Sequence, residues 1–454
     1  VLAASRRPKL TTIGVTLHAG VADKLERLAS ALCAVAHVRS FSFSAAVLRP
    51  GALHPIFSAL AARGTCEELV LDTGHHWENP DLGLLAASLH RLPLRKLTIR
   101  STQYAVPAYW DHLLPPLANL QELSVVAGED FPEWLREGAV AMSHLRKLTV
   151  KFVKTPMENG TVKVPPSLEE LVISSMGHSA LPLVRGLRLP ASVLALTVEY
   201  LAVMDEESLE GDWEAFQAEG FAPVTLTLKT HTGVLPSIPL TLPCYAHLQE
   251  LRLEAVLRAG AAPRAALPPL PDLPHLTRLT LVLGRLEQED MVGLARTVER
   301  APLLVALTLR AEQESLDWGE VVEAVGTRVE LRELVASADH LGQGPLIFAR
   351  AIARLTGLHR VELATVPFPP KSPDHACDQC PVPARQQLTT LVGALLSCPG
   401  LRALSCGMAR TTRRCWVLEA ADAARALGGA VDDGGDRAGG SPGGAGDGGG
   451  AGNG

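Results

Sequence analysis

Few residues of this sequence have types and spacing that suggest chemistry. The clearest set is Cys377-x-x-Cys380, with His375 two residues before it, because this spacing can supply half of the ligands of a tetrahedral zinc site. Such a pair can also act in thiol–disulfide exchange, or it can lie in an inert loop. Cys398 and Cys406 could complete a zinc site, but a sequence repeat also explains their positions. We expect no resident metal or cofactor, and Cys377 and Cys380 remain the metal-ligand candidates.

Motifs of known catalytic chemistry are absent from the sequence. There is no Gly-x-Ser-x-Gly, no glycine-rich phosphate loop that ends in Lys-Ser or Lys-Thr, and no His-Glu-x-x-His. The pairs Asp339-His340 and His75-His76 stand alone. We therefore predict that the protein is not an enzyme.

Aromatic residues make up only 4% of the chain, so their clustering near the N-terminus is informative. Tryptophan and tyrosine are frequent anchors of protein interfaces. The candidate protein-binding residues that lie after neighbouring predicted strands are His75, His76, Trp77, Tyr104, Tyr109 and Trp110. The alternative is that the aromatic residues begin the outer helices and fill the back layer, as the equal offsets of Trp134 and Trp318 in their units suggest.

All of these residues must be positioned by a repeated element, Leu-x-x-Leu-x-Leu, which reads Leu94, Leu97 and Ile99 in its clearest copy. The first apolar residues of the copies are 23 to 28 residues apart, except for a last gap of 43. A period in this range is typical of a solenoid built from stacked supersecondary units. These first residues are Leu10, Val38, Cys66, Leu94, Leu120, Leu145, Leu168, Val193, Phe221, Leu248, Leu276, Leu304, Leu331, Leu358 and Leu401.

The repeat predicts an α/β solenoid of about fifteen units. Each unit is a strand, a turn and a helix, with parallel strands on the concave face and helices or extended segments on the convex face. Apolar residues at helical spacing predict helices over 21–36, 81–92, 291–301, 318–325, 345–355 and 387–397. Proline-rich stretches at 174–192, 229–247 and 254–275 exclude regular helices, so we expect extended or single-turn segments there.

The domain organisation follows from the repeat. We expect one solenoid over residues 1–415, with an inserted loop at 367–383 that accounts for the long last gap. A closing helix is predicted at 416–427, and the glycine-rich segment 428–454 has too few apolar residues to fold.

The composition of the chain narrows the classes of binding partner that we expect. The formal net charge of -6 does not favour nucleic acid or a membrane surface, and no apolar run is long enough to span a membrane. The scattered cysteines fit a reducing compartment, so we expect an intracellular protein of the cytoplasm or nucleus. We expect a monomeric solenoid whose partner is another protein.

Charged residues alternate at the third position of successive units. Glu68, Lys96, Glu122, Lys147 and Glu170 lie on neighbouring predicted strands, so each faces an opposite charge. The alternation is explained best by a self-neutralising ladder that keeps the sheet soluble. The alternative is a recognition surface, for which Lys96 and Lys147 are the candidate protein-binding residues.

The segment 394–404 (ALLSCPGLRAL) resembles the repeats of fungal F-box/leucine-rich-repeat proteins, in which a helix ends in a Cys-Pro or Leu-Pro turn before the strand. The same turn recurs before Leu94, Leu276 and Leu304. The asparagine that this family places after the strand is missing, and no F-box is recognisable. Because the first repeat begins at Leu10, and an exposed first repeat needs a cap, we expect a cap upstream of it. The resemblance implies a protein-interaction module that forms the substrate-recognition part of an F-box-type ubiquitin ligase; the alternative is a structural scaffold without ligase association.

Overall fold

The structure is a computed structural model of the 454-residue chain. It describes residues 11–17, 22–35, 37–45, 53–73, 87–101, 119–127, 142–152, 162–175, 187–200, 221–230, 243–255, 270, 272–283, 288–311, 319–337, 350–364, 393–395, 398 and 401–406.

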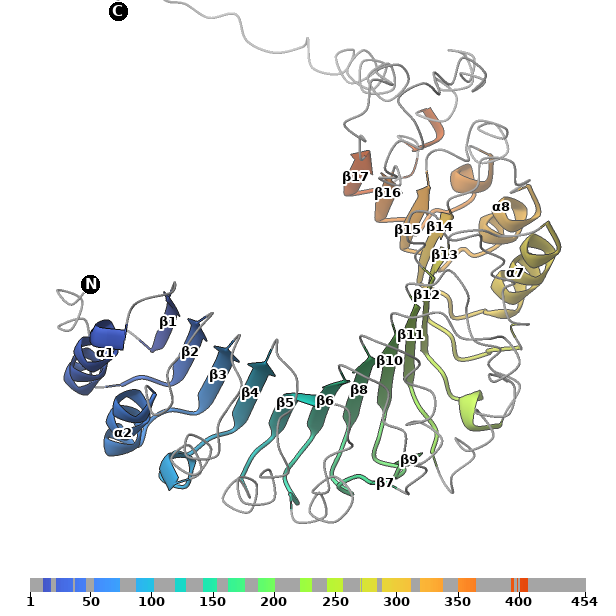
Figure 1. Cartoon of the computed structure of the whole chain (residues 1–454). Coiled ribbons are helices and arrows are strands. Elements are labelled where there is room, and N and C mark those ends of the chain that lie inside the picture. The colour runs from blue at the N-terminus through green and yellow to red at the C-terminus, as the bar shows by residue number, and fades with distance from the viewer. Residues whose placement is uncertain are drawn as a thin grey trace, which may run out of the picture.

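The described part of the chain forms an open arc around a single parallel sheet of fifteen strands (Figure 1). The strands follow one another in chain order, which confirms the predicted solenoid. They are β1 (Thr12–Leu17), β2 (Ser40–Ala45), β3 (Glu68–Thr73), β4 (Lys96–Ser101), β5 (Glu122–Ala127), β6 (Lys147–Phe152), β8 (Glu170–Ser175), β10 (Ala195–Tyr200), β11 (Thr225–Thr230), β12 (Glu250–Ala255), β13 (Arg278–Leu283), β14 (Ala306–Ala311), β15 (Glu333–Ser337), β16 (Arg360–Ala364) and β17 (Ala403–Cys406).

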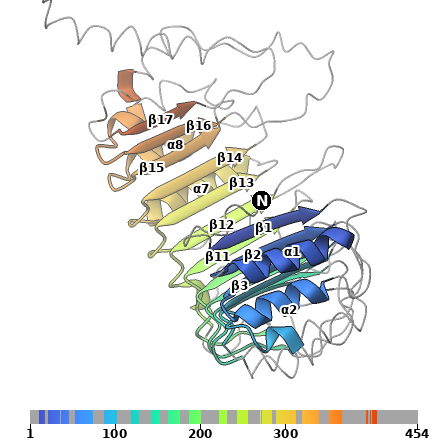
Figure 2. The same cartoon turned by 90° about the vertical axis from the view of Figure 1, so that its left-hand side faces the viewer.

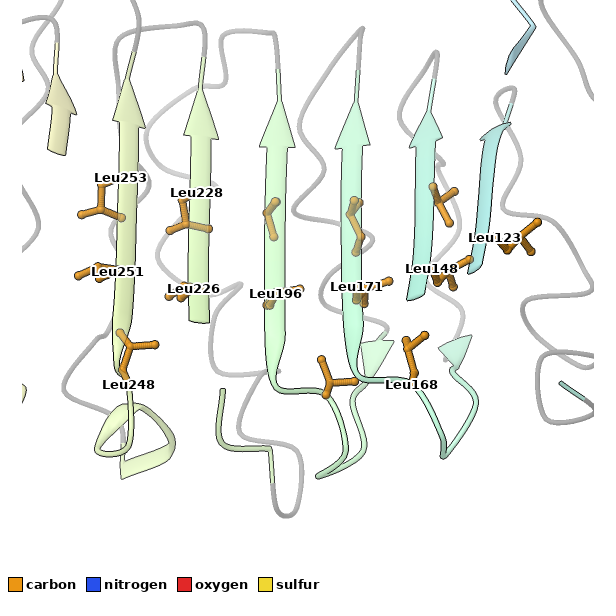
Figure 3. Close-up of a cluster of buried hydrophobic side chains, with 14 of the residues drawn as sticks. Leu123, Leu148, Leu168, Leu171, Leu196, Leu226, Leu228, Leu248, Leu251 and Leu253 are labelled. Atoms are coloured by element: carbon orange, nitrogen blue, oxygen red, sulfur yellow. The ribbon is translucent and has the colours of Figure 1, made fainter. Parts of the chain in front are cut away.

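Successive strands pair without a shift in register, so equivalent residues of the units stand in columns. Leu148 pairs with Leu171, and Leu171 pairs with Leu196. Because side chains alternate along a strand, the second and fourth positions of each strand point into the core. Figure 3 shows these leucine columns, and Leu171 and Leu196 are at most 1% exposed. The core of each unit is therefore completed by its two neighbours.

The helices lie on the outer side of the arc (Figures 1 and 2). They are α1 (Ala22–Ala34), α2 (His54–Arg63), α7 (Gln288–Arg300) and α8 (Gly319–Gly326). The predictions at 21–36, 291–301 and 318–325 are confirmed by α1, α7 and α8. Within the other three predicted helices, residues 87–89, 350–353 and 393–395 are helical.

Helix α2 is not among the helices predicted above. Its buried residues Leu53, Ile56, Phe57 and Leu60 have helical spacing, so the signal was present in the sequence. Pro55 lies in the first turn, and Gly64 ends the helix with a φ of 62°, a left-handed conformation that glycine adopts without a steric cost. Proline in the first turn and glycine after the last turn are common at helix ends, and here they lie at the start and the end of α2.

The middle of the arc has shorter outer segments, as its prolines predict. Residues Val162–Lys163 (β7) and Leu187–Arg188 (β9) form a separate two-stranded parallel sheet, and Pro243–Tyr245 (η6) form a single 3-10 turn. Figure 1 shows β7 and β9 on the outer side of the main sheet. Extended and single-turn segments thus replace the helix in the described parts of these units.

A hydrogen-bonded turn precedes many of the strands. In the unit of β14 the turn is Ala301-Pro302-Leu303-Leu304, in which the Leu304 N–H donates to the Ala301 carbonyl at 3.2 Å. Proline is favoured at the second position of such a turn because its φ is already fixed. Equivalent bonds run from Leu276 to Leu273 and from Leu401 to Cys398, so the recurring turn identified in the sequence is a repeated structural element.

A backbone ladder joins the units where the strands begin. The carbonyl of the residue before each strand accepts two N–H groups of the next unit; for Glu67, the donors are Arg95 at 2.8 Å and Lys96 at 3.0 Å. This pattern repeats from Thr11 to Arg332. Because only backbone atoms take part, it holds neighbouring units together whatever side chains stand there.

One predicted repeat position is wrong. The register of β11 with β10 and β12 places Pro223, not Phe221, at the position equivalent to Val193 and Leu248. Phe221 is nevertheless buried, at 2% exposure. From the sequence alone, either Phe221 or Pro223 could therefore be assigned to the repeat position. Pro223 lacks the N–H that closes the turn in other units, and the sequence therefore carries no turn signal at this point.

Candidate binding surface

The sequence-predicted site residues fall into two groups. The aromatic candidates His75, His76, Trp77, Tyr104, Tyr109 and Trp110, and the cysteines Cys377 and Cys380, lie outside the described residues. The lysine candidates Lys96 and Lys147 lie in β4 and β6 on the concave face of the sheet. The surface that can be built from the described residues is therefore the concave face, where the first, third and fifth strand positions form columns.

The alternating charges predicted at the third position of each unit lie at the first position of each strand, and they form the first-position column. Glu68, Lys96, Glu122, Lys147 and Glu170 stand opposite one another in successive strands, as predicted. The column neutralises itself in pairs: Lys96 Nζ lies 3.0 Å from Glu122 Oε2, and Lys147 Nζ lies 2.6 Å from Glu170 Oε1.

These two ion pairs are partly open to solvent. The Lys96 and Glu122 side chains are 41% and 44% exposed, so water weakens their attraction. The hydrogen bond to Glu122 raises the pKa of Lys96, and the negative charge of Glu68 on the other side adds to this effect. Lys96 therefore stays protonated at neutral pH, and the charges of both lysines are directed at carboxylates of the sheet itself.

The fifth-position column differs, and the sequence analysis did not single it out. Arg100 of β4 and Lys151 of β6 lie on either side of Val126 of β5. Arg100 is exposed and Lys151 is half-buried. In the described part of the chain, neither side chain has an ion-pair or hydrogen-bond partner. The pairing of β4 with β5 ends at Ile99 and Val125, just before Arg100 and Val126.

The third-position column between these two consists mostly of small side chains. Thr98, Ser124 and Thr149 stand next to one another in β4, β5 and β6. After Val172 of β8, Thr197 and Thr227 continue the column in β10 and β11. Thr98 is only 6% exposed although it faces away from the core. A low strip of mostly hydroxyl-bearing side chains thus runs from β4 to β11, between the first-position and fifth-position columns.

The far end of the arc has charge networks that span several strands. Glu254 of β12 accepts from Arg252 of its own strand and lies 3.7 Å from Lys229 of β11. Glu362 of β16 lies 3.0 Å from both Arg310 of β14 and Arg360. Each cation of these networks has a carboxylate partner, in contrast to Arg100 and Lys151.

The described residues contain no group of three or more His, Cys, Asp or Glu side chains that could hold a metal ion. The buried thiol of Cys66 fills the first apolar position of its unit and donates to the Glu68 carbonyl at 3.1 Å. Burial raises the pKa of Cys66 to about 11, so this thiol stays protonated. None of the helices described is both long and apolar enough to cross a membrane.

Comparison with known proteins adds no relative. No protein-family model matches the chain, and no curated protein matches it significantly.

Proposed function

We propose that this protein is a protein–protein interaction module that receives its partner on the concave face of the sheet. The observation that carries the proposal is the continuous inner face of fifteen strands, from which the described helices are directed away (Figure 1). Solenoids use such extended concave surfaces for binding. The low strip of hydroxyl-bearing residues between charged columns supports the same assignment, because a polypeptide lying there can contact many units at once.

The test compares two sets of variants of the full chain. Thr149→Arg with Thr197→Arg places two bulky charges on the concave strip, whereas Arg296→Ala with Glu299→Ala alters exposed residues of helix α7. Proteins that co-purify from the native cells with the wild type and the α7 variant, but not with the strip variant, support concave binding. Equal recovery with all three proteins contradicts it. Circular dichroism checks that each variant is folded.

A narrower version of this proposal makes the solenoid the substrate-recognition part of an F-box-type ubiquitin ligase. It rests on the sequence resemblance of segment 394–404, whose turn closes with the Leu401 N–H donating to the Cys398 carbonyl at 3.1 Å. A structural scaffold without ligase association is the alternative. Recovery of cullin-ligase subunits with the full-length protein favours the ligase version, and a reproducible set of partners that lacks them favours the scaffold.

A further inference from the structure

Among the described residues, two cations lack an ion-pair partner on a face where the other cations of the same strands are paired. Lys96 and Lys147 of β4 and β6 have carboxylate partners in neighbouring strands. Arg100 and Lys151, four residues further along the same two strands, have none in the described part of the chain. Since paired charges are largely neutralised by one another, the attraction for an anion on this part of the face comes mainly from Arg100 and Lys151. Asp72 of β3, which is in register with Arg100, opposes this attraction on the β3 side.

We propose that Arg100 and Lys151 receive an acidic segment of a partner protein, with one carboxylate opposite each cation and an apolar side chain opposite Val126. This inference rests on the proposed concave binding and names the chemistry of the partner. The carboxylates of aspartate and glutamate match both cations, and arginine can bind a carboxylate through two parallel hydrogen bonds. Val126 offers an apolar contact between them, which a plain array of cations would not.

The spacing of the strands sets the spacing of the acids. Neighbouring strands are about 4.8 Å apart, so β4 and β6 are separated by roughly 10 Å. A peptide in the polyproline II conformation advances about 3.1 Å per residue and completes one turn in three residues, so its residues i and i+3 lie on the same face, roughly 9 Å apart. A peptide that crosses the strands with two acidic residues three positions apart can therefore reach both cations.

Neighbouring strands restrict where such a peptide can sit. Asp72 occupies the fifth position of β3, and it is paired in register with Arg100 of β4. Shifted one strand toward β3, the acidic pair would place one carboxylate beside Asp72 and the other beside Val126. Like charges repel and Val126 offers no hydrogen bond, so the site favours one register. The hydroxyls of Ser124 and Thr149 in the adjacent column can donate to the carboxylates in that register.

The test measures binding of a fluorescein-labelled peptide that carries two glutamates three residues apart with a valine between them. The wild-type protein is compared with the double reversal Arg100→Glu and Lys151→Glu. The matched control is Lys96→Gln with Glu122→Gln, which removes one cation and one anion from the same face. We expect the double reversal to weaken binding by at least about tenfold and the control to change it less than about threefold.

Charge exchange gives the sharper readout. A peptide with lysines in place of the glutamates should bind the double reversal better than the wild type. Raising the salt concentration from about 0.05 to 0.5 M should weaken the binding of the glutamate peptide to the wild type and of the lysine peptide to the double reversal. The proposal is overturned if the wild type does not bind the glutamate peptide, if the double reversal binds it equally well, or if only a phosphopeptide or an oligonucleotide binds.

A failure of the acidic-segment proposal can be distinguished from a failure of concave binding. If the strip variant loses the native partner while the double reversal of Arg100 and Lys151 keeps it, concave binding stands and the acidic segment is wrong. If neither variant loses the partner, concave binding itself is wrong.

Discussion

Lys147 Nζ and Glu170 Oε1 lie 2.6 Å apart across two neighbouring strands, and each side chain is more than one-third exposed. This pair belongs to a column of alternating charge in which Lys96 and Glu122 make the other short contact. The alternation neutralises the column locally. It also leaves this column without a dominant charge, whereas Arg100 and Lys151 of the fifth-position column lack an ion-pair partner in the described part of the chain.

The exposed pair should contribute little to stability. A double-mutant cycle with Lys147→Ala and Glu170→Ala is expected to give a coupling free energy of about 0.5 kcal/mol, because solvent screens the attraction and both side chains lose freedom. The measurement is urea unfolding of the four proteins at low and high salt. Coupling above about 2 kcal/mol, or coupling that salt does not weaken, would contradict this account.

Two glycines should respond to the same substitution in opposite ways. A Cβ at Gly357 would meet the Val329 carbonyl oxygen at 2.9 Å, whereas a Cβ at Gly293 would meet nothing within 4 Å. Gly357→Ala forces backbone to move and should destabilise the protein by about 1–3 kcal/mol. Gly293→Ala lies within helix α7 and should stabilise it by up to about 1 kcal/mol. Unfolding midpoints of the two variants provide the comparison, and changes of the same sign would refute the packing at Gly357.

Tyr245 carries a buried hydroxyl that has no hydrogen-bond partner among the described residues. Its side chain is 0% exposed, and burial raises its pKa. Tyr245→Phe removes an unsatisfied polar group and keeps the ring, so stability should stay unchanged or rise by about 1 kcal/mol. Tyr245→Ala leaves a cavity and should cost about 3–5 kcal/mol. Denaturant unfolding measures both changes. A loss above about 1 kcal/mol for Tyr245→Phe would mean that the hydroxyl has a partner.

Cys66 and Cys33 should differ sharply in reactivity. Cys33 is exposed, while burial raises the pKa of Cys66 from 9.0 to about 11. The thiolate is the reactive form, so at pH 8 iodoacetamide should modify Cys33 and spare Cys66 until the protein unfolds. Peptide mapping by mass spectrometry resolves the two sites. Rapid modification of Cys66 in the folded protein would show that the first apolar position of its unit is accessible to solvent.

The same pKa shift gives a direction for stability at high pH. Below about pH 9 the thiol is protonated in both states, and its burial contributes fully. Between about pH 9 and 11 the unfolded chain loses the proton first, so the free energy of unfolding should fall. The Cys66→Ala variant, compared over the same pH range, isolates this contribution.

The sequence predicted most of the fold because the repeat is periodic and the core columns are aliphatic. Among the described residues, thirteen of the fourteen first apolar positions from Val38 to Leu401 match the register of the strands that follow them. The failure at Phe221 has a physical cause: Phe221 and Pro223 are both buried, and Pro223 cannot donate the turn hydrogen bond. Helix α2 could have been predicted from the spacing of Leu53, Ile56 and Phe57 together with the boundary residues Pro55 and Gly64.

The binding surface was less predictable. The alternation of charge in the first-position column follows directly from the spacing of the sequence repeat. That Lys96 and Lys147 pair with carboxylates follows from the register of the strands. Which cations lack a partner depends on side-chain geometry: Lys147 pairs with Glu170, although Glu122 stands equally beside it in the register. Arg100 and Lys151 became candidates only when the partners of their neighbours were known.

Site-specific photo-crosslinking shows whether the concave face receives a protein partner. A photoreactive amino acid is placed at Thr197 on the concave strip or at Arg296 on helix α7, and the crosslinked proteins are identified in the native cells. The account predicts a defined adduct from position 197 and none from position 296. An adduct from position 296 alone, or the same adduct from both positions, would contradict it.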